Sequence, residues 1–211
     1  MSVRQQHLRR AVALEAATVL WNIIEGVVAV GAGAVSGSVA LIGFGIDSFI
    51  ETSSALVVGL RFGAELSGSD RENSPAVQNR ERQAARIAGT LLLILALYIT
   101  VDAGRRLLGF GSQAEESTIG IVLTAVSLVV MPFLGRAKLK TASALSSAAL
   151  KADAYETITC AWLSLTTLVG LLLNTWLGWW WADPLAALVL VPLIVREGLE
   201  ARRGGCHCHD G

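Results

Sequence analysis

The stretch Gly37–Leu60 reads GSVALIGFGIDSFIETSSALVVGL, and Asp47 and Glu51 are its only charged side chains. It is long enough to cross a bilayer, which takes about 20 apolar residues in a helix. Since lipid satisfies no backbone polar groups, we expect this stretch to be helical. The whole chain of 211 residues is 53% hydrophobic and 16% charged, whereas a soluble domain is typically about 25% charged. The sequence therefore predicts a membrane protein.

Further apolar stretches of spanning length lie on both sides of this one and predict an all-α integral membrane fold with six transmembrane helices. The expected spans are about Ala11–Val35, Gly37–Leu60, Ala84–Gly104, Thr118–Gly135, Thr141–Trp176 and Trp179–Val195. We expect residues 1–203 to form one transmembrane domain and residues 204–211 to be a short cytoplasmic tail rich in Cys and His.

The basic residues outside the spans predict the orientation. With six spans and an internal N-terminus, all of them except Arg105 and Arg106 are cytoplasmic, Lys138 included. This bias predicts that both termini are cytoplasmic. The formal net charge is zero, so no basic excess suggests a nucleic-acid partner. We expect a multi-pass protein of the bacterial inner membrane.

Polar and ionisable side chains recur inside the expected spans, where each ionised group costs about 3 kcal/mol on insertion scales and therefore needs a reason. They have helical spacing, so each set lies along one helix face. The sets are Asn22 and Glu25; Asp47 and Glu51; and Asp153, Glu156 and Cys160. Because the second and fifth spans run in opposite directions, we expect Asp47 level with Cys160, and Glu51 level with Glu156.

Several carboxylates at one depth need protons or a cation to balance them. Lys151 is the only base that we place on this face. Carboxylates together with a thiolate suit a borderline divalent ion such as zinc, since magnesium and calcium prefer oxygen alone. The residues thus predict a metal site built from Asp47, Glu51, Glu156 and Cys160, with no cofactor and no catalytic residue.

Two motifs resemble the cation diffusion facilitator family. Ser36–Glu51 is similar to the family's second span, in which acids occur at Asp-x-x-x-Asp spacing, and here the second acid is Glu51. Lys151–Cys160 is similar to the fifth span, usually Ala-Asp-x-x-His-x-x-x-Asp, with Glu156 in place of the histidine and Cys160 in place of the last aspartate. The Ala182-Asp183-Pro184 motif that opens the sixth span is also similar.

The resemblance implies a homodimeric exporter of zinc or a related divalent ion that works by alternating access, usually in exchange for protons. Because Glu156 and Cys160 differ from the residues usual in the family, cadmium stays a candidate ion beside zinc. Family members usually carry a cytoplasmic C-terminal domain, which we expect this chain to lack. We therefore expect the dimer contact to come from membrane helices, with small residues such as those in Gly26–Ala29 and Gly31–Ala34 allowing close packing.

Structural roles compete with metal binding at several positions. Asp153 is a further metal candidate, but it also fits an ion pair with Lys151 or with a neighbouring helix. Asn22 and Glu25 suit extra ligands, a proton relay or hydrogen bonds between helices. Asp183 fits a helix cap, and Asp102 with Arg105 and Arg106 fits a charge group at the outer surface.

The tail supports a different class of function. Cys206, His207, Cys208 and His209 fit metal delivery or sensing, although adjacent ligands space poorly for a compact zinc site. The alternative to an exporter is therefore a membrane protein that binds or senses zinc without transporting it. The sequence has no phosphate-binding glycine loop and no nucleophile and base pair, so we do not expect an enzyme.

Overall fold

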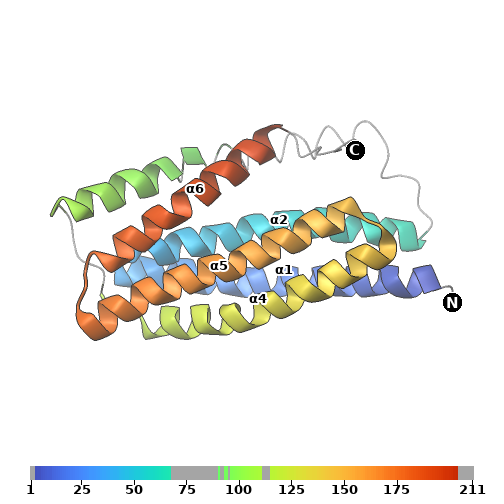
Figure 1. Ribbon diagram of the computed structural model, residues 1–211, viewed down its shortest axis with the longest axis horizontal. Coiled ribbons are helices and arrows are strands. Elements are labelled where there is room, and N and C mark those ends of the chain that lie inside the picture. The colour runs from blue at the N-terminus through green and yellow to red at the C-terminus, as the bar shows by residue number, and fades with distance from the viewer. Residues whose placement is uncertain (1–2, 68–89, 91–92, 95, 111–114, 204–211) are drawn as a thin grey trace.

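The computed structural model describes residues 3–67, 90, 93–94, 96–110 and 115–203, and within these ranges it has helices and no strands (Figure 1). The predicted all-α fold is confirmed for these residues. Residues 96–107, drawn in green without a label, are helical as well. The labelled helices are α1 (Val3–Ser36), α2 (Val39–Ser67), α4 (Thr118–Leu145), α5 (Ala148–Leu177) and α6 (Ala182–Arg203).

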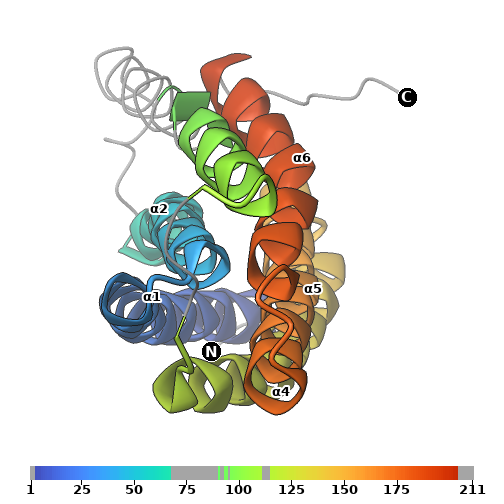
Figure 2. The same cartoon turned by 90° about the vertical axis from the view of Figure 1, so that its left-hand side faces the viewer.

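Four helices form a closed bundle. α1 packs on α2 and α4, and α5 packs on α4 and α2, while α6 contacts α2 and α5 from the outside. Figure 2 shows this arrangement end-on, with α6 and the green helical segment side by side along one edge of the four. The bundle interior is therefore lined by one face each of α1, α2, α4 and α5.

Among the residues that the structure describes, four helices are long and apolar enough to cross a membrane: α1, α2, α4 and Ala149–Leu177 of α5. α6 is not among them, although we expected a span at Trp179–Val195. The expected span Ala84–Gly104 lies partly outside the described residues. The start of α1 and the end of α6 lie toward the same end of the picture in Figure 1, and which membrane side that end faces stays a prediction.

The boundary between α4 and α5 differs from the expectation. We expected one helix over Thr141–Trp176, but α4 continues to Leu145 and a turn follows. Ser146 adopts a left-handed conformation with φ 49° and caps α4, and the Ser147 hydroxyl accepts a hydrogen bond from the Leu150 N–H at the start of α5. Two serines thus end one helix and begin the next. A hydropathy pattern does not detect such a boundary, because it depends on capping and not on apolar content.

Glycines bring α1 and α2 close together. A Cβ atom built on Gly26 would lie 3.0 Å from the Gly45 carbonyl oxygen, and one on Gly45 would lie 2.8 Å from the Ala29 Cβ. Gly33 is equally tight against Ile42, whereas a Cβ on Gly31 would meet nothing within 4 Å. Of the small residues that we assigned to a dimer contact, Gly26, Ala29 and Gly33 therefore pack within the chain.

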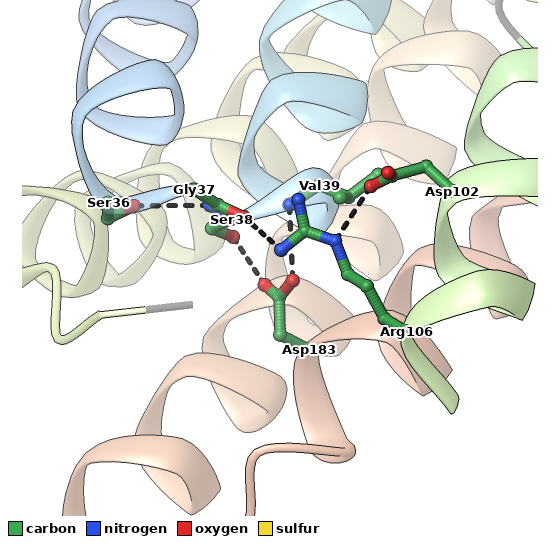
Figure 3. A network of polar contacts seen from close by, with 7 residues as sticks. All are labelled: Ser36, Gly37, Ser38, Val39, Asp102, Arg106 and Asp183. Atoms are coloured by element: carbon green, nitrogen blue, oxygen red, sulfur yellow. Dashed lines mark hydrogen bonds and ion pairs between the residues drawn. The ribbon is translucent and has the colours of Figure 1, made fainter. Parts of the chain in front are cut away.

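Asp183 of α6 holds the start of α2. Its carboxylate accepts hydrogen bonds from the Ser38 hydroxyl and from the Val39 N–H at 3.1 Å (Figure 3). Asp183 therefore caps α2, a helix far from it in sequence, in addition to lying in the first turn of its own helix. We expected Asp183 and Asp102 to have separate roles, but both belong to one polar network at the start of α2. Arg106 pairs with Asp102 at 2.7 Å and donates a hydrogen bond to the carbonyl of Gly37, the residue before Ser38.

Replacing Gly45 by alanine is expected to separate α1 from α2. The new Cβ would lie within 2.9 Å of the Val30 backbone nitrogen, which cannot move away without shifting the helix. We expect a loss of about 1–3 kcal/mol in the free energy of unfolding, as for other overpacked interiors. The measurement is unfolding of the purified protein in a denaturing detergent titration.

Gly31→Ala is the matched control because it adds the same methyl group on α1 into open space. It should change stability by about 1 kcal/mol at most, in the stabilising direction, since alanine favours a helix. Equal destabilisation by both variants would contradict the close α1–α2 approach.

Candidate functional site

The acids of α2 meet the cysteine of α5 inside the bundle. Asp47 and Glu51 lie one turn apart on α2 and are 6% and 4% exposed, and Cys160 of α5 is 2% exposed. Thr157 and Cys160 of α5 face the Glu51 carboxylate. The Cys160 thiol in turn lies within electrostatic range of Asp47 and Glu51. We call Asp47, Glu51 and Cys160 the acid site.

The acid site leaves polar atoms unpaired. Within the described residues, neither oxygen of Glu51 has a hydrogen-bond partner. A buried carboxylate without donors is unfavourable, since its lost hydration is not replaced. The arrangement fits a carboxylate that binds a proton or a metal ion.

α1 contributes a further acid to the same region. Glu25 is fully buried, its Oε2 accepts a hydrogen bond from the Ser48 hydroxyl at 3.0 Å, and it acts electrostatically on both Glu51 and Cys160. Asn22 lies one turn away on α1, is fully buried, and its amide has no hydrogen-bond partner in the described part of the chain. Both residues thus lie beside the acid site.

Glu156 is placed differently from the expectation. We expected it level with Glu51, but Glu51 faces Thr157 and Cys160 instead, and the Glu156 side chain is exposed. The buried face of α5 follows Asp153, Thr157 and Cys160, and Glu156 lies at the edge of that face. Among the described residues, no three Cys, His, Asp or Glu side chains already converge closely enough to hold a metal ion.

A buried ion triad lies one to two turns from the acid site along α5. The Lys138 Nζ of α4 lies 3.0 Å from the Glu15 Oε2 of α1 and 2.5 Å from the Asp153 Oδ2 of α5. Lys138 is 0% exposed, and Glu15 and Asp153 are 1% exposed. We call these three residues the triad. The triad joins three helices through one ammonium group.

The triad decides between two alternatives for Asp153 and corrects one expectation, for Lys138. Asp153 does pair with a neighbouring helix, but the partner is Lys138 and not Lys151, whose side chain is exposed. Lys138 was expected at the cytoplasmic surface, and Glu15 was not a candidate. A signal for both exists in the sequence. Glu15 lies two turns before Asn22 on the same buried face of α1, and Lys138 follows Gly135 on a face with Thr141.

The tail candidates Cys206, His207, Cys208 and His209 lie outside the described residues. The boundary at residue 204 and the assignment of the tail therefore stay predictions.

Comparison with known proteins adds a family match. The family model for the cation efflux transmembrane domain matches residues 16–203 of this chain. This range contains the acid site and both of the sequence motifs that we singled out, and within the triad it covers Lys138 and Asp153 but begins one residue after Glu15.

Individual relatives share between 22% and 28% of their residues with this chain over the aligned regions. An uncharacterized transporter of Synechocystis is 28% identical over 75% of this chain and 51% of its own length. The cation-efflux pump FieF of Shewanella oneidensis is 25% identical over 78% of the chain and 55% of its own. A cadmium, cobalt and zinc/H(+)-K(+) antiporter of Bacillus subtilis is 22% identical over 83% and 56%. The chain spans about half the length of these relatives.

Removing the triad ammonium is expected to destabilise the bundle. Lys138→Met leaves two buried carboxylates facing each other, and breaking a buried ion pair from one side costs about 3–5 kcal/mol. Lys140→Met is the matched control, because Lys140 lies on the same helix and is exposed, and it should change the free energy of unfolding by about 0.5 kcal/mol or less. Detergent unfolding that gives both variants the same stability would contradict the buried position of Lys138.

Proposed function

Because the chain belongs to the cation efflux family, we propose that it carries divalent metal cations across the membrane, with the ion bound at the acid site. It is a multi-pass integral membrane protein of a bacterial membrane. The observation that carries the proposal is the Glu51 carboxylate, which is buried beside a thiol with neither oxygen hydrogen-bonded in the described chain. A cation at this position would supply the charge that the carboxylate lacks.

Zinc is the cargo that the ligand types favour. Zinc accepts thiolate and carboxylate ligands in one tetrahedral set, and cadmium benefits still more from the thiolate. The Bacillus subtilis relative is named for cadmium, cobalt and zinc. We propose zinc first and cadmium second, and no enzymatic activity.

Proton exchange follows from the same groups. Without metal, buried carboxylates and a buried thiol are held neutral by protons, and metal binding requires the deprotonated ligands. Each ion that enters therefore displaces protons, and a high proton concentration on the other side favours its release. The Bacillus subtilis relative is named as an antiporter, which agrees with this cycle. We also propose a homodimer formed through membrane helices.

Asp47, Glu51 and Cys160 are the first three ligands of the proposed site, and Glu156 is the fourth. Glu156 precedes Cys160 by one helical turn and lies at the edge of the buried face, so a change of rotamer or a small rotation of α5 would bring it inward. Glu25 has a supporting role in this scheme, because its Oε2 already accepts the Ser48 hydroxyl and ties α1 to α2.

Zinc flux tests the proposal. In proteoliposomes with an imposed pH gradient, Asp47→Ala should reduce zinc flux at least tenfold, because it removes a metal-binding carboxylate from the acid site. Glu65→Gln, a change on the exposed part of α2, is the control and should leave the flux unchanged. Zinc flux at the native rate in the Asp47 variant would contradict the assignment of the metal site. Zinc flux that does not depend on the pH gradient would contradict proton exchange.

A pair of glutamine variants tests the ligand set. Glu156→Gln is expected to weaken zinc binding about tenfold or more, since loss of one charged ligand costs about 1.4 kcal/mol or more. Glu25→Gln should weaken it less than threefold, because glutamine keeps an acceptor for Ser48. Calorimetric titration with zinc measures both, and the opposite ranking would assign the fourth position to Glu25.

A further inference from the structure

The triad holds more negative than positive charge. Glu15 and Asp153 supply two carboxylates and Lys138 one ammonium, and all three side chains are at most 1% exposed. If every group were ionised, the bundle would enclose a net charge of minus one without water to stabilise it. Such a charge is neutralised in practice by a proton or another cation.

Both carboxyl groups approach the same Lys138 Nζ, at 3.0 Å from the Glu15 Oε2 and 2.5 Å from the Asp153 Oδ2, so they lie close to each other. The side chains of Glu15 and Asp153 lie within hydrogen-bonding reach of each other, and two ionised carboxylates have no donor to share. The outward oxygens, Glu15 Oε1 and Asp153 Oδ1, have no hydrogen-bond partner in the part of the chain described. A single proton would give the pair a donor and neutralise the carboxylate charge that the ammonium leaves unbalanced.

Within the described residues, Glu15 and Asp153 both form their ion pairs with Lys138, and no second base supplies this balance. α4 presents Lys138 to Glu15, and α5 presents Asp153. α2 approaches through Gly59, where an added Cβ would lie 3.0 Å from the Glu15 Cβ, and its nearest acid is Glu51, which interacts electrostatically with Lys138 and Asp153. On α1 itself the next buried polar group is Thr18, whose hydroxyl donates to the Leu14 carbonyl.

We propose that the triad is a proton site separate from the metal site, holding one exchangeable proton shared by Glu15 and Asp153. This inference rests on the proposed metal transport for its coupling. When a divalent cation binds beside Glu51, its positive charge favours the ionised triad, with net charge minus one, over the neutral protonated triad. The shared proton leaves for water, the carboxyl becomes a carboxylate, and release of the metal allows the proton to return. By linkage, each ligand weakens the other.

Counting protons tests the inference. Zinc is titrated into the purified full chain by calorimetry in buffers of different ionisation enthalpy, which gives the number of protons released per zinc bound. Glu15→Gln and Asp153→Asn each leave one carboxylate opposite Lys138, so the triad is neutral without a proton. Both variants should bind zinc and release about one proton fewer than the native chain. Glu65→Gln, an exposed exchange of the same kind, should match the native count, and protons from the tail are common to all four proteins.

A purely structural triad would lower stability in these variants and leave the proton count unchanged, and that result overturns the inference. If the native chain binds no zinc, the proposed function fails and infrared spectroscopy still tests the proton. The native spectrum should contain protonated carboxyl absorption, and one component of it should be lost in Glu15→Gln and kept in Asp47→Asn. A Glu15→Gln spectrum that keeps every protonated carboxyl component of the native spectrum would overturn the proton site.

Discussion

Every carboxylate that the bundle holds away from water needs a positive charge or a proton beside it, because a bare charge in an apolar interior costs many kcal/mol. α1, α2 and α5 each bring acids to the same interior. One part of this charge is balanced within the chain by Lys138. The rest, around Glu51, has no counter-charge of its own in direct contact among the described residues.

The packing of the helices follows from this division. Gly26 and Gly45 let α1 approach α2 closely, which allows the Ser48 hydroxyl to reach Glu25. Lys138 ties α4 to α1 and α5 below the acid site, and Asp183 fixes the start of α2 at the other end of the bundle. The acid site therefore lies between the Lys138 ion pairs at one end and the Asp183 cap at the other. The absence of side chains at Gly26 and Gly45 lets α1 and α2 pack closely beside it.

Much of this arrangement was predictable from local sequence. Apolar length gave the helices, and helical spacing placed Asp47, Glu51 and Cys160 on inward faces. What hydropathy could not give was the partner of each buried charge, since Lys138 stands next to exposed bases in the run Arg136–Lys140 and differs from them only in the helix face that it occupies. The serine turn that ends α4 and the exposed position of Glu156 likewise depend on backbone geometry and on rotation about the axis of α5, to which residue spacing alone is insensitive.

The proposed transport requires that a divalent cation binds between α2 and α5 at the acid site. Anomalous diffraction at the zinc absorption edge, from crystals of the full chain grown with zinc, tests it most directly. We expect an anomalous peak about 2.3 Å from the Cys160 sulfur and about 2.0–2.2 Å from carboxylate oxygens of Asp47 and Glu51. Zinc peaks confined to the Cys/His tail, with none between α2 and α5, would contradict it.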